Sequence, residues 1–69
     1  PEVGYELQLE TGEVVAEAEI AWPENKVAGL SPVQVGFADT FAHQGWRTLP
    51  IDGGMEWVEQ LQKLLEETE

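Results

Sequence analysis

The chain has no cysteine and a single histidine among its 69 residues, and it has no long apolar run. Without thiols it can form neither a disulfide framework nor a zinc site built on thiolates. A single domain without cysteine fits the cytosol, so we expect a cytoplasmic protein. The longest stretch without a charged side chain is residues 27–38, shorter than the ~20 apolar residues of a membrane span. We therefore expect no membrane partner.

The chain is also poor in basic residues, with three Lys or Arg against 14 Asp or Glu and a formal net charge of −11. Proteins that bind a nucleic-acid backbone usually neutralise several phosphates with Lys and Arg. We therefore expect no direct contact with nucleic acid, and attraction to a basic protein or a metal cation. The acidic residues also have a general role, because net charge keeps a small domain soluble.

The first half of the chain shows the period of two that is typical of half-buried strands. Apolar residues alternate over 5–10, and Gly12 supplies the left-handed backbone of a tight turn. The alternation resumes over 14–22. It predicts that five apolar side chains share one face of this second strand: Val14, Ala16, Ala18, Ile20 and Trp22.

A further turn is expected after the second strand. Pro23 suits the second position of a type I turn, and Asn25 tolerates unusual backbone angles. Residues 26–30 then predict a short third strand. Because the three strands are joined by short turns, we expect an antiparallel three-stranded meander.

The apolar period changes to that of a helix after the third strand. Ser31 is a good N-cap, Pro32 suits the first helical position, and Gln34 stands at the third position of a capping box. The predicted apolar stripe of this helix consists of Val33, Phe37, Ala38, Phe41 and Ala42.

A helix end and a fourth strand follow. Gly45 is expected to end the first helix as its left-handed residue, with Trp46 packing back on Phe41. Residues 46–51 predict a fourth strand. Pro50 has no backbone donor, so this strand should lie at an edge of the sheet or end there.

The remaining residues predict a second helix, capped by Asp52. Its apolar stripe consists of Trp57, Val58, Leu61, Leu64 and Leu65. The order is β-β-β-α-β-α, with the first helix as a crossover, so the fourth strand should run parallel to a neighbour. We expect an α+β fold with helices packed on a small mixed sheet. Residues 1–69 make a single small domain, and Pro1 in place of Met indicates a processed product or part of a larger protein.

Two segments carry a family resemblance. Residues 17–28 read EAEIAWPENKVA, and residues 41–49 read FAHQGWRTL. Together they resemble the endonuclease-like fold of the PD-(D/E)XK superfamily, most closely its very-short-patch-repair branch. Similar tails occur at the ends of bacterial helicase-like proteins. The resemblance implies an acidic metal ligand at Glu19, and a second carboxylate with a lysine two positions later on the following strand.

The chain departs from this family pattern on the third strand. That strand reads Lys26-Val27-Ala28-Gly29-Leu30, with no carboxylate and with its lysine before the required place. Metal-assisted cleavage of a phosphodiester needs clustered carboxylates that hold Mg²⁺ and orient water. The resemblance therefore implies a copy that has lost its catalysis, and we expect no cofactor.

Three residues are candidates for a binding site. Glu17 and Glu19 lie two positions apart on one strand face, so they form either a weak divalent-ion site or a solvated sheet face. The adjacent strand extends this acidic surface with Glu6, Gln8 and Glu10. Trp22 ends its strand beside a turn, where it either joins the core or anchors a partner, since Trp is enriched at interface hot spots.

We hypothesise a non-catalytic accessory or protein-interaction domain of a DNA-processing protein, with a degenerate endonuclease-like core. Its partner is expected to be a protein with a basic surface, or another domain of the same parent chain, bound through Trp22, Glu17 and Glu19. One alternative is a small acidic inhibitor that mimics nucleic-acid charge on a DNA-binding protein. The other is a metal-dependent nuclease with a rearranged site around Glu17 and Glu19. The sequence favours the absence of enzymatic activity without deciding it.

Overall fold

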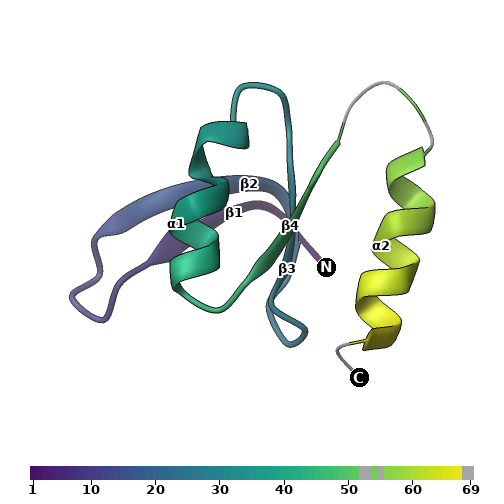
Figure 1. Ribbon diagram of the computed structural model, residues 1–69. Helices are drawn as coiled ribbons and strands as arrows, with labels where there is room; N and C mark the ends of the chain where they lie inside the picture. Colours follow the sequence, from purple (N-terminus) through teal and green to yellow (C-terminus); the bar gives the residue numbers. More distant parts are fainter. Residues whose placement is uncertain (52–53, 55, 68–69) are drawn as a thin grey trace.

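The structure of the protein is a computed structural model that describes residues 1–51, 54 and 56–67. Its elements are β1 (Glu2–Gln8), β2 (Val14–Trp22), β3 (Val27–Leu30), the 3-10 turn η1 (Val35–Phe37), α1 (Ala38–His43), β4 (Arg47–Pro50) and α2 (Glu56–Glu67). Within the described residues one sheet has the order β1-β2-β3-β4, with β4 parallel to β3 and the other pairs antiparallel (Figure 1). The predicted α+β fold, its meander and its helical crossover are confirmed.

The turn between β1 and β2 follows the prediction. The backbone N–H of Gly12 donates to the carbonyl of Leu9 at 2.8 Å, and the N–H of Leu9 donates to the carbonyl of Glu13 at 2.9 Å. Gly12 has a φ of 89°, in the left-handed region that glycine adopts without steric cost. Glycine therefore closes the hairpin at this position.

The turn between β2 and β3 places Pro23 where the sequence predicts it, but its left-handed residue is not Asn25. The N–H of Asn25 donates to the carbonyl of Trp22 at 3.1 Å, which places Pro23 at the second position of the turn. The left-handed residue is Lys26, with a φ of 54°, and not Asn25. Lys26 redirects the chain into the sheet, where its carbonyl accepts from the N–H of Arg47 at 2.9 Å.

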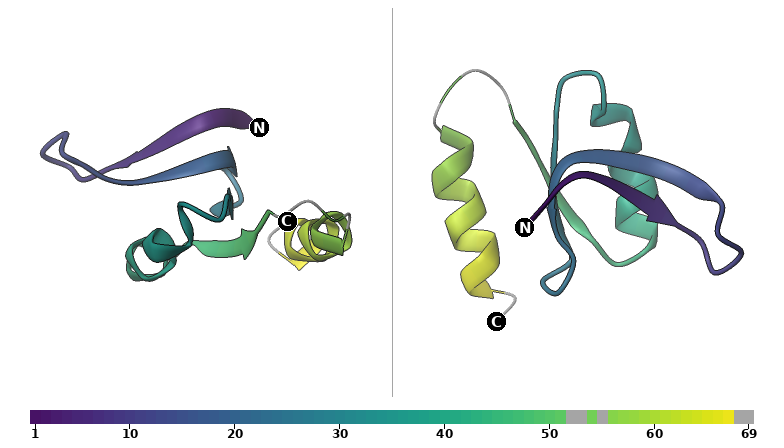
Figure 2. Two further views of the ribbon diagram at one scale, coloured as in Figure 1. Left: turned by 90° about the horizontal axis from the view of Figure 1, so that it is seen from above. Right: turned by 180° about the vertical axis from the view of Figure 1, so that it is seen from behind.

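The second strand does not keep its apolar side chains on one face, so that prediction is wrong. Ala16 and Ala18 share a buried cluster with Ala21, whereas Trp22 packs against a different cluster. Opposite this change of face lies Gly4, whose φ of 67° is far from the extended values of a regular strand. The hairpin of β1 and β2 bends as it extends across α1, as Figure 2 shows.

The helix after β3 begins later than the sequence predicts. The N–H of Ser31 donates to Oε1 of Gln34 at 3.0 Å, but the Oγ of Ser31 is buried without a partner, so the reciprocal bond of a capping box is missing. The chain passes through turns and η1, and α1 begins at Ala38 with Phe37 as its N-cap residue. Ser31 is therefore not the N-cap of a regular helix.

The shortened helix also corrects the predicted apolar stripe. Val33 lies in the turn before η1 and is 90% exposed. Ala42 is exposed as well, because a helix of 6 residues presents only a narrow side to the sheet. Phe41 is fully buried, and Phe37 and Ala38 pack against its cluster, as expected.

The end of α1 has the left-handed glycine and the apolar contact that the sequence predicts. The N–H of Trp46 donates to the carbonyl of Phe41, and the N–H of Gly45 to that of Ala42, each at 3.0 Å. Gly45 has a φ of 85°, and the rings of Phe41 and Trp46 meet edge to face with centroids 5.3 Å apart. This is a Schellman ending with its apolar contact.

The fourth strand lies at the edge of the described sheet, as Pro50 predicts. The N–H of Arg47 donates to Lys26, and the N–H of Ile51 donates to Leu30 at 2.7 Å, so odd-numbered residues direct their donors toward β3. Pro50 therefore faces the outer edge, where its missing N–H removes no bond of the ladder. Asp52, the predicted cap of the second helix, lies outside the described residues.

Two clusters of apolar side chains lie on opposite sides of β3 and β4, and Figure 2 shows β4 between the two helices. The α1 cluster consists of Leu7, Ala16, Ala18, Ala21, Ala28, Leu30, Phe41 and Trp46. The α2 cluster consists of buried Val27, Leu49 and Leu61, with half-buried Trp22, Trp57, Leu64 and Leu65 against them. All four residues of β3 are buried, because the strand contributes to both clusters. No helix among the described residues has the length and apolar character of a membrane span.

Candidate functional site

An open hollow of about 420 Å³ lies at the end of β2, beside Trp22. Its lining residues are Pro1, Glu2, Trp22, Pro23, Glu24 and Asn25. Trp22 is half-buried, so one part of its side chain packs against the α2 cluster while another part lines the hollow. Trp22 is thus partly a core residue, and its role as an anchor for a partner stays a prediction.

Two strands and one turn bring the lining residues together. Trp22 is the last residue of β2, and the turn after it carries Pro23, Glu24 and Asn25. Glu2 comes from the start of β1, where it pairs with Ala21 in the antiparallel register. The turn and the β1–β2 pairing therefore both determine the shape of the hollow.

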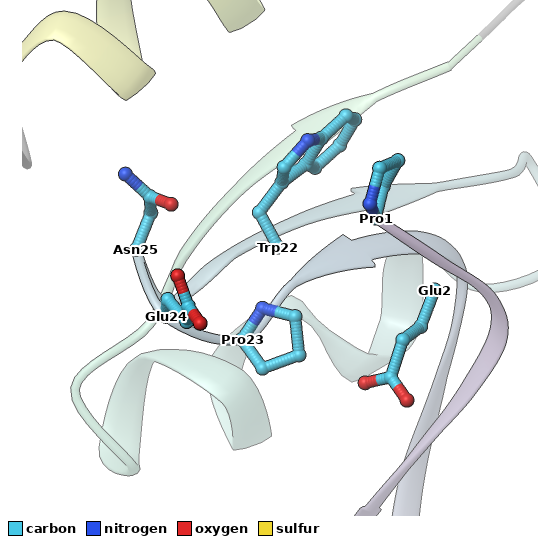
Figure 3. A pocket seen from close by; sticks show the side chains of 6 residues that line it. All are labelled: Pro1, Glu2, Trp22, Pro23, Glu24 and Asn25. Carbon is cyan, nitrogen blue, oxygen red and sulfur yellow. The ribbon is translucent and has the colours of Figure 1, made fainter.

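The hollow has an aromatic side and an acidic side. In Figure 3 the indole of Trp22 lies on one side, and the carboxylates of Glu2 and Glu24 lie on the other, with Pro23 between them. Among the residues that the structure describes, no Lys, Arg or His side chain lines it. Such a combination favours a ligand that carries positive charge and a flat or apolar surface.

The predicted acidic pair lies outside this hollow. Glu17 and Glu19 are exposed on β2, and Glu6 of β1 is the direct register partner of Glu17. Like charges directly opposite each other on neighbouring strands cost stability. We call Glu6, Glu17 and Glu19 the acidic strand face. A cationic partner would relieve the repulsion on this face.

The acidic strand face does not extend over all the residues that the sequence suggested. Gln8 is exposed and pairs with Val14, and Glu10 belongs to the turn after β1. In the part of the chain that the structure describes, no three His, Asp or Glu side chains are grouped so that they could hold a metal ion. On β3, the place where the family resemblance requires a carboxylate is occupied by buried Val27, Ala28 and Gly29.

The site contains residues that sequence reasoning did not single out. Glu24 directly follows the Trp-Pro pair, so the sequence alone predicts that it lies near Trp22. Glu2 is separated from Trp22 by 20 positions, and only the register of β1 against β2 brings it close. A carboxylate on a different strand carries no local sequence signal of this kind.

A second hollow, of about 290 Å³, lies between β4 and α2. Its lining residues are Thr48, Leu49, Gln60, Lys63, Leu64 and Glu67. The carboxylate of Glu67 accepts a hydrogen bond from the guanidinium of Arg47, in an exposed ion pair. Acidic and basic side chains thus balance each other here, so this hollow has no charge preference comparable to that of the hollow at Trp22.

Comparison with known protein families, curated proteins and solved structures finds no match to this chain.

Proposed function

We propose that the chain is a non-catalytic protein-interaction domain that binds a basic surface of a partner protein. The observation that carries the proposal is the half-buried Trp22, which is supported by the α2 cluster on one side and open to a carboxylate-lined hollow on the other. Tryptophan anchors of this kind dominate the energetics of many interfaces. The partner is a separate protein or another domain of the same parent chain.

The charge of the domain supports the same partner chemistry. The net charge of −11 attracts a basic surface over distances of about a Debye length and speeds encounter. The acidic strand face and the hollow at Trp22 both contain β1 and β2 residues. Electrostatic steering then brings the partner in, and the Trp22 contact contributes the short-range binding energy.

The resemblance of residues 17–28 and 41–49 to endonuclease-like domains suggests the setting. In this proposal the domain is an accessory module of a DNA-processing protein and keeps a degenerate endonuclease-like core. Purified protein with Mg²⁺ or Mn²⁺ should then leave DNA and RNA intact. Cleavage that disappears in a Glu19→Ala variant would overturn the proposal in favour of a metal-dependent nuclease.

The binding test uses a fluorescent peptide of nine arginines as a model basic surface. Fluorescence anisotropy should show binding that weakens with added salt, and about 5-fold or greater weakening in a Glu17→Lys/Glu19→Lys variant. The matched control is Glu59→Lys/Glu66→Lys, which makes the same charge change at exposed positions of α2. The control should weaken binding less, because it lies on another element.

The same titration separates the proposal from its acidic alternative. Trp22→Phe should weaken binding measurably if Trp22 is an anchor. A nucleic-acid mimic depends on charge alone, so it would lose binding on charge reversal and be indifferent to Trp22→Phe. Absence of any binding at low salt, or equal losses in the Glu17→Lys/Glu19→Lys and control variants, contradicts the proposed interaction domain.

A further inference from the structure

The hollow at Trp22 has features that select one kind of side chain from a basic partner. Its aromatic side is the indole of Trp22, and its acidic side carries Glu2 and Glu24 (Figure 3). We infer that this hollow receives an arginine side chain of the partner, stacked on Trp22 and paired with the two carboxylates. The inference rests on the proposed function and names the chemistry of its central contact.

The size and support of the hollow suit such a contact. Its volume of about 420 Å³ lies within the usual range of ~300–1,000 Å³ for ligand pockets. Trp22 pairs with Val27 in the register of β2 and β3, and it packs against the α2 cluster. The indole is therefore held in place before the partner arrives, which lowers the entropic cost of binding.

The lining disfavours the other classes of ligand. An anion would meet two carboxylates, and the amine of Pro1 is the one basic group among the described lining residues. An apolar side chain would cover Trp22 but would take water from Glu2 and Glu24 without replacing its hydrogen bonds. A cation with several N–H donors satisfies both sides of the hollow at once.

Arginine fits this lining better than lysine does. A guanidinium is planar, so it stacks on an indole face while its N–H groups donate in the plane toward carboxylates. Glu2 and Glu24 lie on either side of Pro23 in Figure 3, so the two carboxylates are placed to accept from different edges of one guanidinium. The ammonium of lysine is a more strongly hydrated point charge and forms no planar stack.

The test compares peptides of nine arginines and nine lysines, which carry the same charge. The wild-type protein should bind the arginine peptide about 5-fold more tightly. Only a guanidinium both stacks on an indole and donates hydrogen bonds in its own plane to carboxylates. A Glu2→Gln/Glu24→Gln variant should bind the two peptides with about equal affinity, because neutral amides accept hydrogen bonds from a guanidinium more weakly than carboxylates do. The control Glu59→Gln/Glu66→Gln should keep the preference, because it removes the same charge from α2.

A spectroscopic measurement locates the contact. In ¹⁵N-labelled protein, the indole N–H signal of Trp22, assigned by its loss in Trp22→Phe, should shift more with the arginine peptide than the indole signals of Trp46 and Trp57. Equal affinity for the two peptides, or a preference that survives Glu2→Gln/Glu24→Gln, overturns the arginine site but leaves the interaction domain in place. Absence of binding to both peptides overturns the proposed function itself.

Discussion

The two sides of β3 differ in how completely they are covered. The α1 cluster contains eight buried residues, and Tyr5, Trp46 and Phe41 form a chain of rings with centroids 5.2 and 5.3 Å apart. The α2 cluster has three buried residues, although α2 has 12 residues and α1 has 6. The longer helix thus has the less complete core beneath it.

In this molecule, coverage follows the number of elements that converge on each side and not the length of the helix. The α1 cluster draws side chains from β1, β2, β3 and α1, together with Trp46 just before β4. Among the described residues, the strands contribute three side chains to the α2 cluster: Trp22 of β2, Val27 of β3 and Leu49 of β4. Buried apolar area contributes roughly 25 cal/mol per Å², so most of the stability should reside on the α1 side. We expect α2 to be the first element to detach.

The largest expected effect on stability comes from removing a buried side chain from the α1 cluster. Phe41→Ala should lower the free energy of unfolding by about 3–5 kcal/mol, because it opens a cavity around a fully buried ring. That loss is comparable to the whole stability of a small domain, so the variant should be largely unfolded by circular dichroism. Val33→Ala, at a 90% exposed position, should change stability by less than about 0.5 kcal/mol. A folded Phe41→Ala variant with unchanged urea midpoint contradicts this comparison.

A smaller effect is expected on the other side. Leu61→Ala should cost about 2 kcal/mol, the low end for a buried leucine, because its half-buried neighbours can collapse toward it. Hydrogen exchange should speed up mainly in the amides of α2, while those of β2 keep their protection. If exchange rises equally in β2 and α2, the two sides unfold as one unit and the comparison is wrong.

The smallest effect is expected from the ion pair that joins β4 to α2. Arg47 and Glu67 are both exposed, and exposed pairs contribute roughly 0–1 kcal/mol. Arg47→Met should lower stability by less than about 0.5 kcal/mol, and high salt should remove the difference. A loss as large as that of Leu61→Ala would show that the ion pair, and not Leu61, attaches the helix.

Local sequence signals predicted the fold well. Gly12 and Gly45 both adopt the left-handed backbone that their positions indicated, and Pro50 lies at the edge. The start of α1 was not predictable in the same way. Gln34 makes its half of a capping box with Ser31, but whether the serine hydroxyl completes it depends on how the segment packs.

The site was predictable only in part, for a related reason. Trp22 stood out because a large aromatic ended an alternating strand next to a turn. Its acidic neighbour Glu2 depends on the register of β1, and the change of face in β2 occurs opposite Gly4 on another strand. Contacts between strands follow from register and bending, which no pattern within a single strand encodes.

The outer strands of the described sheet carry a further consequence, for self-association. An exposed strand edge is a template on which a second copy of a chain can add a strand. Along β4, Pro50 has no backbone N–H to offer at the outer edge. Along β1, exposed Glu2 and Glu6 repel an identical strand, and the left-handed Gly4 between them disturbs the even spacing of donors. Crowded copies of this domain should therefore resist edge-to-edge aggregation.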